Sequence, residues 1–173
     1  TVSIPRSMTA QISAYTRGEK NSLTISGNPF VLATPGECNV NGVLVTAVEG
    51  TDENSTMLRV DTENISIGHL GLTNKKLTAR QSEVLSGVDI LCVPVGHPEA
   101  YDTEAAVKTV NELEPRIVIP IAHKSDNDPD AKAPDAFIKE MGMAGKVNPE
   151  KKVIIKKKDL PQEDMLMILL TKE

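Results

Sequence analysis

Short apolar runs, separated by residues typical of tight turns, fill the chain from Phe30 to Gly68. Pro35-Gly36, Asn41-Gly42 and the polar stretch 61–64 divide this region, and Asn-Gly between two apolar runs is a strong hairpin signal. We therefore predict an antiparallel meander over 30–68. The strands expected in it are 30–33, 42–48 together with Val40, 56–60 and 65–67.

Helices and strands are predicted to alternate further along the chain. A weakly amphipathic helix is expected over 76–85, and the nearly continuous apolar run 89–95 is typical of a strand buried on both faces. A second helix should begin at Asp102, which suits an N-cap, and end before Pro115. The run 116–121 predicts another buried strand, and two strands joined by a helix form a parallel βαβ unit.

The C-terminal part is predicted to hold one short helix, over 134–143, followed by two strands, 153–157 and 165–170, paired as a hairpin. Lysines at 151–152 and 156–158 stand among apolar residues and between acidic neighbours at the first of these strands. This pattern favours a charged strand edge that prevents aggregation over a binding patch.

Length and composition indicate one α/β domain spanning 1–173, because 39% of the residues are hydrophobic and 25% are charged. A net charge of −5 and an aromatic content of 2% argue against a nucleic-acid partner. Cys38 and Cys92 have neither a disulfide framework nor metal-ligand spacing, which favours the cytoplasm. No apolar run is long enough to span a bilayer. We therefore expect a protein or small-molecule partner and no membrane.

Several different short motifs follow one another along the chain in a specific order. The motifs are Gly27-Asn28-Pro29-Phe30-Val31, Pro35-Gly36-Glu37, Asn41-Gly42-Val43, His69-Leu70-Gly71, 88–96, 102–115 and 117–120. Together they resemble the metallo-β-lactamase fold, in the compact branch of metal-dependent hydrolases similar to ascorbate-phosphate lactonase. The resemblance implies an αββα sandwich of two mixed β-sheets with helices outside and a metal site at the ends of the strands. The family's opening strands precede the stretch that begins here at Thr1, so an N-terminally truncated sandwich is expected.

The resemblance also locates the expected metal ligands. Members of the family bind one or two zinc or related ions through an H-x-H-x-D-H loop, a later His, a bridging Asp and a final His. If Tyr15-Thr16 ends the strand before that loop, none of the mapped positions holds its expected residue, and the strand 45–50 carries no His. The residues at the mapped positions are Arg17, Glu19, Asn21, Ser22, Leu72 and Ala122. Only Glu19 is chemically able to coordinate a metal.

Three histidines remain, and a structural or surface role is the simpler interpretation of each. His69 follows a predicted strand beside the bridging position, and His97 lies in a loop that borders the active-site mouth in the family. His123 lies one residue past the lost final ligand, so strand alternation points it to the opposite side. A metal site rebuilt from Glu19, His97 and His123, with zinc or manganese as the ion, is the alternative.

The absence of imidazole ligands at the mapped positions indicates a degenerate, non-catalytic member of the family, with no cofactor, that acts by binding or assembly. Its partner would be a protein or a second copy of the chain, docked on the former cleft or on an exposed sheet edge. A small molecule in the remnant cleft is a further option. The alternative is an active metal-dependent hydrolase of phosphorylated or lactone-type small substrates with a rearranged metal site.

Overall fold

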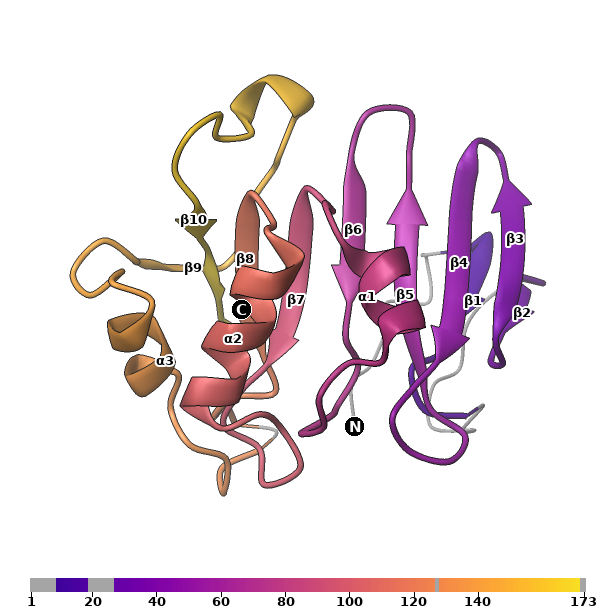
Figure 1. The fold of residues 1–173 in the computed structure, drawn as a ribbon. Coiled ribbons are helices and arrows are strands. Elements are labelled where there is room, and N and C mark those ends of the chain that lie inside the picture. The colour runs from indigo at the N-terminus through magenta and orange to yellow at the C-terminus, as the bar shows by residue number, and fades with distance from the viewer. Residues whose placement is uncertain (1–8, 19–26, 127, 172–173) are drawn as a thin grey trace.

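A seven-stranded mixed sheet forms the centre of the molecule in the computed structural model, which describes residues 9–18, 27–126 and 128–171 (Figure 1). The strands of this sheet are β3 (Gly36–Val40), β4 (Val43–Glu49), β5 (Thr56–Asp61), β6 (Ser66–His69), β7 (Ile90–Pro94), β8 (Ile117–Ile121) and β10 (Leu166–Met167). Their order across the sheet is β10-β8-β7-β6-β5-β4-β3.

The two halves of this sheet follow the two sequence patterns. Strands β3 to β6 pair antiparallel as a meander, whereas β6, β7, β8 and β10 run parallel. Asn41 and Gly42 have φ values of +53° and +82° at the turn between β3 and β4, as a two-residue hairpin turn requires. The meander predicted over 30–68 is therefore confirmed from β3 to β6, and the βαβ unit is confirmed as well.

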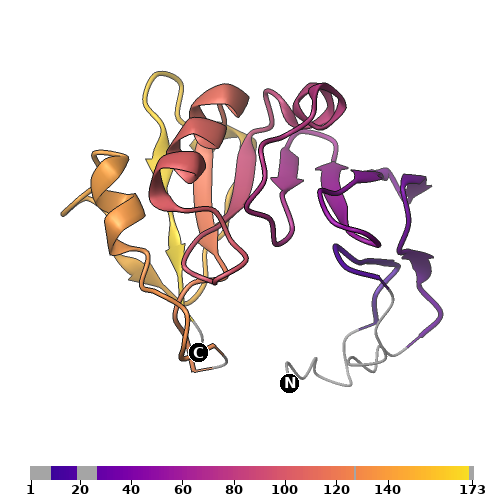
Figure 2. The same cartoon turned by 60° about the horizontal axis from the view of Figure 1, so that its bottom comes forward.

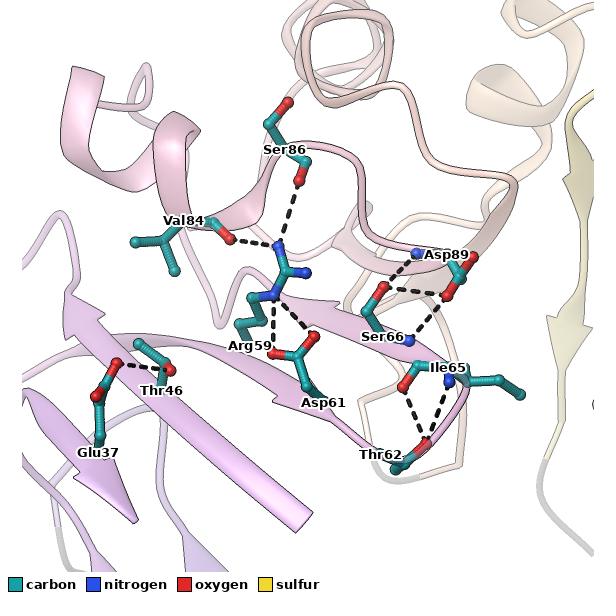
Figure 3. Close-up of polar contacts among 10 residues, drawn as sticks. All are labelled: Glu37, Thr46, Arg59, Asp61, Thr62, Ile65, Ser66, Val84, Ser86 and Asp89. Carbon is teal, nitrogen blue, oxygen red and sulfur yellow. Dashed lines mark hydrogen bonds and ion pairs between the residues drawn. The ribbon is translucent and has the colours of Figure 1, made fainter. Parts of the chain in front are cut away.

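Three helices cover one face of the large sheet: α1 (Ala79–Leu85), α2 (Thr103–Leu113) and α3 (Asp135–Glu140). The Asp102 carboxylate caps α2 by accepting the Ala105 N–H at 2.8 Å, as predicted. The Arg59 guanidinium of β5 donates to the Val84 carbonyl at 3.0 Å and so ties the sheet to α1 (Figure 3). Within the described residues, none of the helices is long and apolar enough to cross a membrane.

Two short pairs of parallel strands form the layer on the other face. β1 (Ile12–Ala14) pairs with β2 (Phe30–Leu32), and β9 (Pro149–Glu150) pairs with β11 (Leu169–Leu170). The β1–β2 pair packs over β3, β4 and β5, and the C-terminal segment packs over β7 and β8 (Figure 2). The expected α/β architecture with a large mixed sheet is confirmed, and its second layer consists here of two separate strand pairs.

Two predicted strand pairings are wrong. The run at 30–33 does not enter the meander, because β2 lies in the second layer beside β1 and buries Leu32 there. The predicted hairpin of 153–157 with 165–170 does not form. The first segment runs as an irregular loop into a 3-10 helix, η1 (Lys157–Asp159), and β10 instead pairs with the apolar edge of β8. The pairing of β10 with β8 buries Met167 and Ile168, and this burial favours it over the predicted hairpin.

Candidate functional site

The described positions where the family's ligands would stand lie at one edge of the large sheet, the edge formed by the carboxyl ends of β6, β7 and β8. Thr16, which precedes Arg17, accepts the Thr56 N–H at 2.8 Å. A Cβ atom added to Gly71, which precedes Leu72, would lie 3.2 Å from the Thr16 Cβ. Ala122 lies next to the end of β8. The residues that precede Arg17 and Leu72 therefore lie close together at this edge.

An ion pair occupies the mapped position of the first histidine. Arg17 Nη2 lies 2.8 Å from Glu99 Oε2, with 38% and 57% of the two side chains exposed. Glu99 also donates its backbone N–H to His97 Nδ1 at 3.0 Å. Since Glu99 lies in the β7–α2 loop and Arg17 lies just past β1, the pair connects the second layer to the loop that borders the site.

A second ion pair lies beside the first. Lys75 Nζ lies 2.6 Å from Asp52 Oδ1 and donates to the Thr51 carbonyl at 3.1 Å. The hydrogen bond from Lys75 to Asp52, together with the charges of Lys75 and Arg17, holds the pKa of Asp52 below its usual value against the opposing effect of desolvation. Asp52 is therefore ionised at neutral pH and forms a salt bridge with Lys75.

A cleft with a volume of about 550 Å³ lies around these two ion pairs. Its walls carry two cationic, three acidic and two amide side chains. The lining residues are Arg17, Gly18, Asp52, Glu53, Asn54, Asn74, Lys75 and Glu99. A polar cleft with both signs of charge suits a small polar ligand or a polar protein segment better than an apolar ligand.

His97 and His123 lie on adjacent loops at the same edge. The His97 N–H donates to the Ala122 carbonyl at 2.9 Å, so the two loops are in contact. The side chains have other partners: His97 Nε2 lies 4.0 Å from Asp128 Oδ2, and His123 Nδ1 lies 3.2 Å from the Lys124 carbonyl. Glu19, the third residue of the predicted rebuilt site, lies outside the described residues, so that site stays a prediction.

The environment of His69 supports a structural role. Its Nδ1 accepts the Gly71 N–H at 3.0 Å, which fixes the turn after β6. Burial lowers the pKa of His69, so the imidazole is neutral at physiological pH. Its register partner on β7 is Cys92, and burial raises the pKa of that thiol to about 11. Neither group is charged, and the thiolate form is suppressed.

The described residues do not fit the family's metal site. Zinc and manganese centres need several imidazole or carboxylate ligands that converge on one point. Among residues 9–18, 27–126 and 128–171, no three His, Cys, Asp or Glu side chains lie close enough to hold an ion. The guanidinium of Arg17, the aliphatic side chain of Leu72 and the methyl group of Ala122 cannot coordinate a cation.

Sequence reasoning missed the partners of these replacements. Glu99, Lys75 and Asp52 carried no signal of a site in the sequence, because each is an ordinary charged residue in a loop. His97 was placed correctly beside the mouth, and Glu99 is only two residues away from it. The pairing of Arg17 with Glu99 has no signal in the sequence, because it depends on how two loops approach each other.

Known proteins share this architecture. A candidate Zn-dependent hydrolase of the metallo-β-lactamase superfamily from Thermotoga maritima matches with a TM-score of 0.78, covering 94% of this chain and 84% of that chain at 22% identity. The metallo hydrolase Igni18 from Ignicoccus hospitalis has a TM-score of 0.54, covering 69% of this chain and 55% of that chain at 17% identity. The metallo-β-lactamase fold protein YhfI from Bacillus subtilis has a TM-score of 0.52, covering 84% of this chain and 53% of that chain at 8% identity.

A match to a family model identifies the superfamily more directly than the structural similarities do. None of the curated proteins matches this chain. The three structures share so little sequence with it that they indicate its fold and not an activity. Residues 10–122, well over half of the chain, match the model of the β-lactamase superfamily domain. The chain belongs to the metallo-β-lactamase superfamily, a family of hydrolase-like proteins.

Proposed function

We propose that this protein is a non-catalytic member of its superfamily that acts by binding a partner in the cleft around Arg17 and Glu99. The observation that carries the proposal is the 2.8 Å ion pair between these two side chains. A guanidinium is a permanent cation with no lone pair for a metal. Its charge repels a divalent ion from the place where the family's first histidine would stand.

The other replacements support the same proposal. Leu72 and Ala122 remove a bridging carboxylate and an imidazole, so the chemistry that activates a metal-bound water has no ligands at these positions. The cleft itself is retained, with a volume of about 550 Å³ and charged groups of both signs. A retained polar cleft without these ligands favours a binding or assembly role, with a protein segment, a second copy or a small polar molecule as the occupant.

Metal titration tests this proposal against the alternative of a rebuilt metal site. Isothermal titration calorimetry of chelator-free protein with Zn²⁺ and with Mn²⁺ should give no stoichiometric binding. Assays with a phosphomonoester and a lactone, with each ion present, should give no hydrolysis above the buffer rate. Stoichiometric binding that disappears in His97→Ala and in His123→Ala would instead establish the rebuilt site and the hydrolase alternative.

Sedimentation velocity over a range of protein concentrations tests assembly separately. A concentration-dependent shift to a larger species, weakened in Glu99→Ala, would identify a second copy as the occupant of the cleft. A constant monomer would leave a different protein or a small molecule as the occupant.

A further inference from the structure

The segment 151–158, here called the basic loop, differs in charge from the rest of the chain. It contains five lysines and no acidic residue, in the sequence Lys-Lys-Val-Ile-Ile-Lys-Lys-Lys, whereas the whole chain has a net charge of −5. The three aliphatic residues lie between the two groups of lysines. Within the described part of the chain, Lys157 is the member of the loop that forms an ion pair, so four ammonium groups face solvent.

Aliphatic side chains of the basic loop are exposed. Ile154 is 71% exposed and Val153 is 37% exposed. Ile154 has the largest exposed fraction among the large apolar residues that the structure describes. Exposure of a β-branched aliphatic residue between lysines is costly in water, and such an arrangement is typical of a surface that meets a partner.

The core holds the loop in this position from both sides. Ile155 packs on a cluster formed by Ile90, Ile117, Leu160 and Ile168. Because neighbouring side chains on an extended segment point to opposite sides, burial of Ile155 directs Ile154 outward. The 3-10 helix η1 then turns the chain back toward the buried Leu160.

A buried carboxylate fixes the end of the loop to the sheet. Lys157 Nζ lies 3.5 Å from Asp89 Oδ1, and Arg116 Nε lies 3.7 Å from the same oxygen. The other carboxylate oxygen accepts the Ser66 N–H at 2.9 Å (Figure 3). The loop consequently projects beyond the amino ends of β7 and β8, as the golden-yellow segment at the top of Figure 1 shows. This edge lies opposite the cleft.

We propose that the basic loop docks on an anionic lipid surface. Ile154 enters the boundary between headgroups and acyl chains, and the surrounding lysines contact lipid phosphates while their methylene stems follow the apolar side chain. Each lysine near an anionic bilayer strengthens binding by about five-fold, because it contributes about 1 kcal/mol. This is peripheral binding, which needs no membrane-spanning helix.

A lipid surface fits the loop better than an acidic protein does. The loop is a single projecting segment of eight residues (Figure 1), whereas a stable protein interface covers roughly 800 Å² on each partner. Acidic residues, Glu150 and Asp159, flank the segment, so the run of lysines is confined to it. The sequence-based expectation of no membrane rests on the absence of an apolar run long enough to span a bilayer. The sequence alone predicts a charged strand edge for these lysines, and the strand predicted over 153–157 does not form.

Vesicle co-sedimentation of the full chain tests the proposal. We expect binding to vesicles of phosphatidylcholine with phosphatidylglycerol, loss of binding to pure phosphatidylcholine, and loss at high salt. Lys151→Gln/Lys152→Gln should weaken binding by about 25-fold if each lysine contributes about five-fold. Ile154→Ser should weaken it by about ten-fold.

The matched control Lys108→Gln/Lys139→Gln, which neutralises two exposed helix lysines, should bind like the unmodified protein. All five substituted side chains are exposed, and equal melting temperatures would show that the variants fold.

Three outcomes would overturn the proposal. The first is the absence of binding to anionic vesicles. The second is an equal loss in the control and in the Lys151→Gln/Lys152→Gln variant, which would show a diffuse charge effect. The third is full binding by Ile154→Ser together with equally strong binding to soluble polyglutamate, which would identify an acidic protein segment as the partner. Because the cleft lies at the other edge of the sheet, none of these outcomes bears on the metal titration.

Discussion

The charged residues at the two edges of the large sheet differ in their burial and in the number of their partners. At the amino ends of β7 and β8, Asp89 is 8% exposed, and its carboxylate receives two hydrogen bonds from Ser66 and the charges of Arg116 and Lys157. At the carboxyl ends, Arg17 and Glu99 form a single ion pair with solvent around both side chains. One edge has a network around a buried carboxylate, and the other has exposed ion pairs, of which Lys75–Asp52 is the second.

This difference shows which edge the fold depends on. A buried charge without its partners is strongly destabilising, so the Asp89 network constrains every residue in it. Exposed ion pairs contribute little to stability, so their residues are replaceable. The edge that carries metal chemistry in the family is thus the edge where this chain could exchange ligands for other residues without losing its fold.

The largest expected effect concerns the backbone of the carboxyl edge. Gly96 has a φ of +91°, and a Cβ atom there would overlap the Lys132 carbonyl oxygen and lie 3.1 Å from the His123 Cα. We expect Gly96→Ala to lower the free energy of unfolding by about 3 kcal/mol or more, because it adds backbone strain to a clash. Urea denaturation followed by circular dichroism measures this loss.

Gly87→Ala is the matched control for that variant. Gly87 also has a positive φ, +67°, but nothing lies within 4 Å of the added Cβ. Its substitution should cost about 1 kcal/mol. Equal losses in the two variants would contradict this expectation. They would show that the close packing of the loops around Gly96 adds nothing to the cost of the substitution.

The next largest effect is expected at the amino edge. Asp89→Ala removes the acceptor of the Ser66 N–H and leaves Arg116 and Lys157 without their counter-charge. We expect a loss of about 2 kcal/mol in the free energy of unfolding. A loss no larger than that of an exposed ion pair would mean that the two edges do not differ.

The pH dependence of stability reports on the same carboxylate. Burial acts to raise the pKa of Asp89, but the hydrogen bonds from Ser66 and the charge of Lys157 outweigh it, so the net shift is downward. The stabilisation is present above the ordinary aspartate pKa, about 3.9, and is lost as the pH falls from there through the folded-state pKa. Denaturation midpoints measured between pH 5 and pH 2.5 should therefore fall less steeply in Asp89→Ala than in the unmodified protein.

The smallest effect is expected for the ion pair in the cleft. A double-mutant cycle with Arg17→Ala and Glu99→Ala should give a coupling of about 0.5 kcal/mol, because both side chains are solvated. Its value should fall further at 1 M salt. A coupling comparable to the Asp89 loss would show that the pair is a structural element of the fold.

Local patterns predicted most of the fold. The Asn41-Gly42 turn, the apolar runs of β7 and β8 and the N-cap at Asp102 are each encoded within a few residues. The strand pairings that failed depend on distant residues: β2 joins β1 across the intervening 15 residues, and β10 joins β8 rather than its predicted neighbour in sequence. The β-branched run 153–155 resembled a strand, although none of the described strands pairs with it.

The candidate site was predictable only in part. The family resemblance located Arg17, Leu72 and Ala122 as replacements of metal ligands, and the structure places Thr16 and Gly71, the residues that precede Arg17 and Leu72, close together. That Glu99 would pair with Arg17 could not be deduced, because the pairing depends on how two loops approach each other. Asp89 was expected as part of a buried apolar run, yet it proves to be the polar centre of the opposite edge, since its partners come from three distant segments.

The pairing of β10 with β8 has a consequence for synthesis. During translation, the outer side of β8 has no neighbour until Leu166 and Met167 leave the ribosome, about 45 residues later. For that interval, the nascent chain displays an open apolar strand to its surroundings. Chaperone capture, or pairing with another emerging chain, would therefore act on this edge of β8.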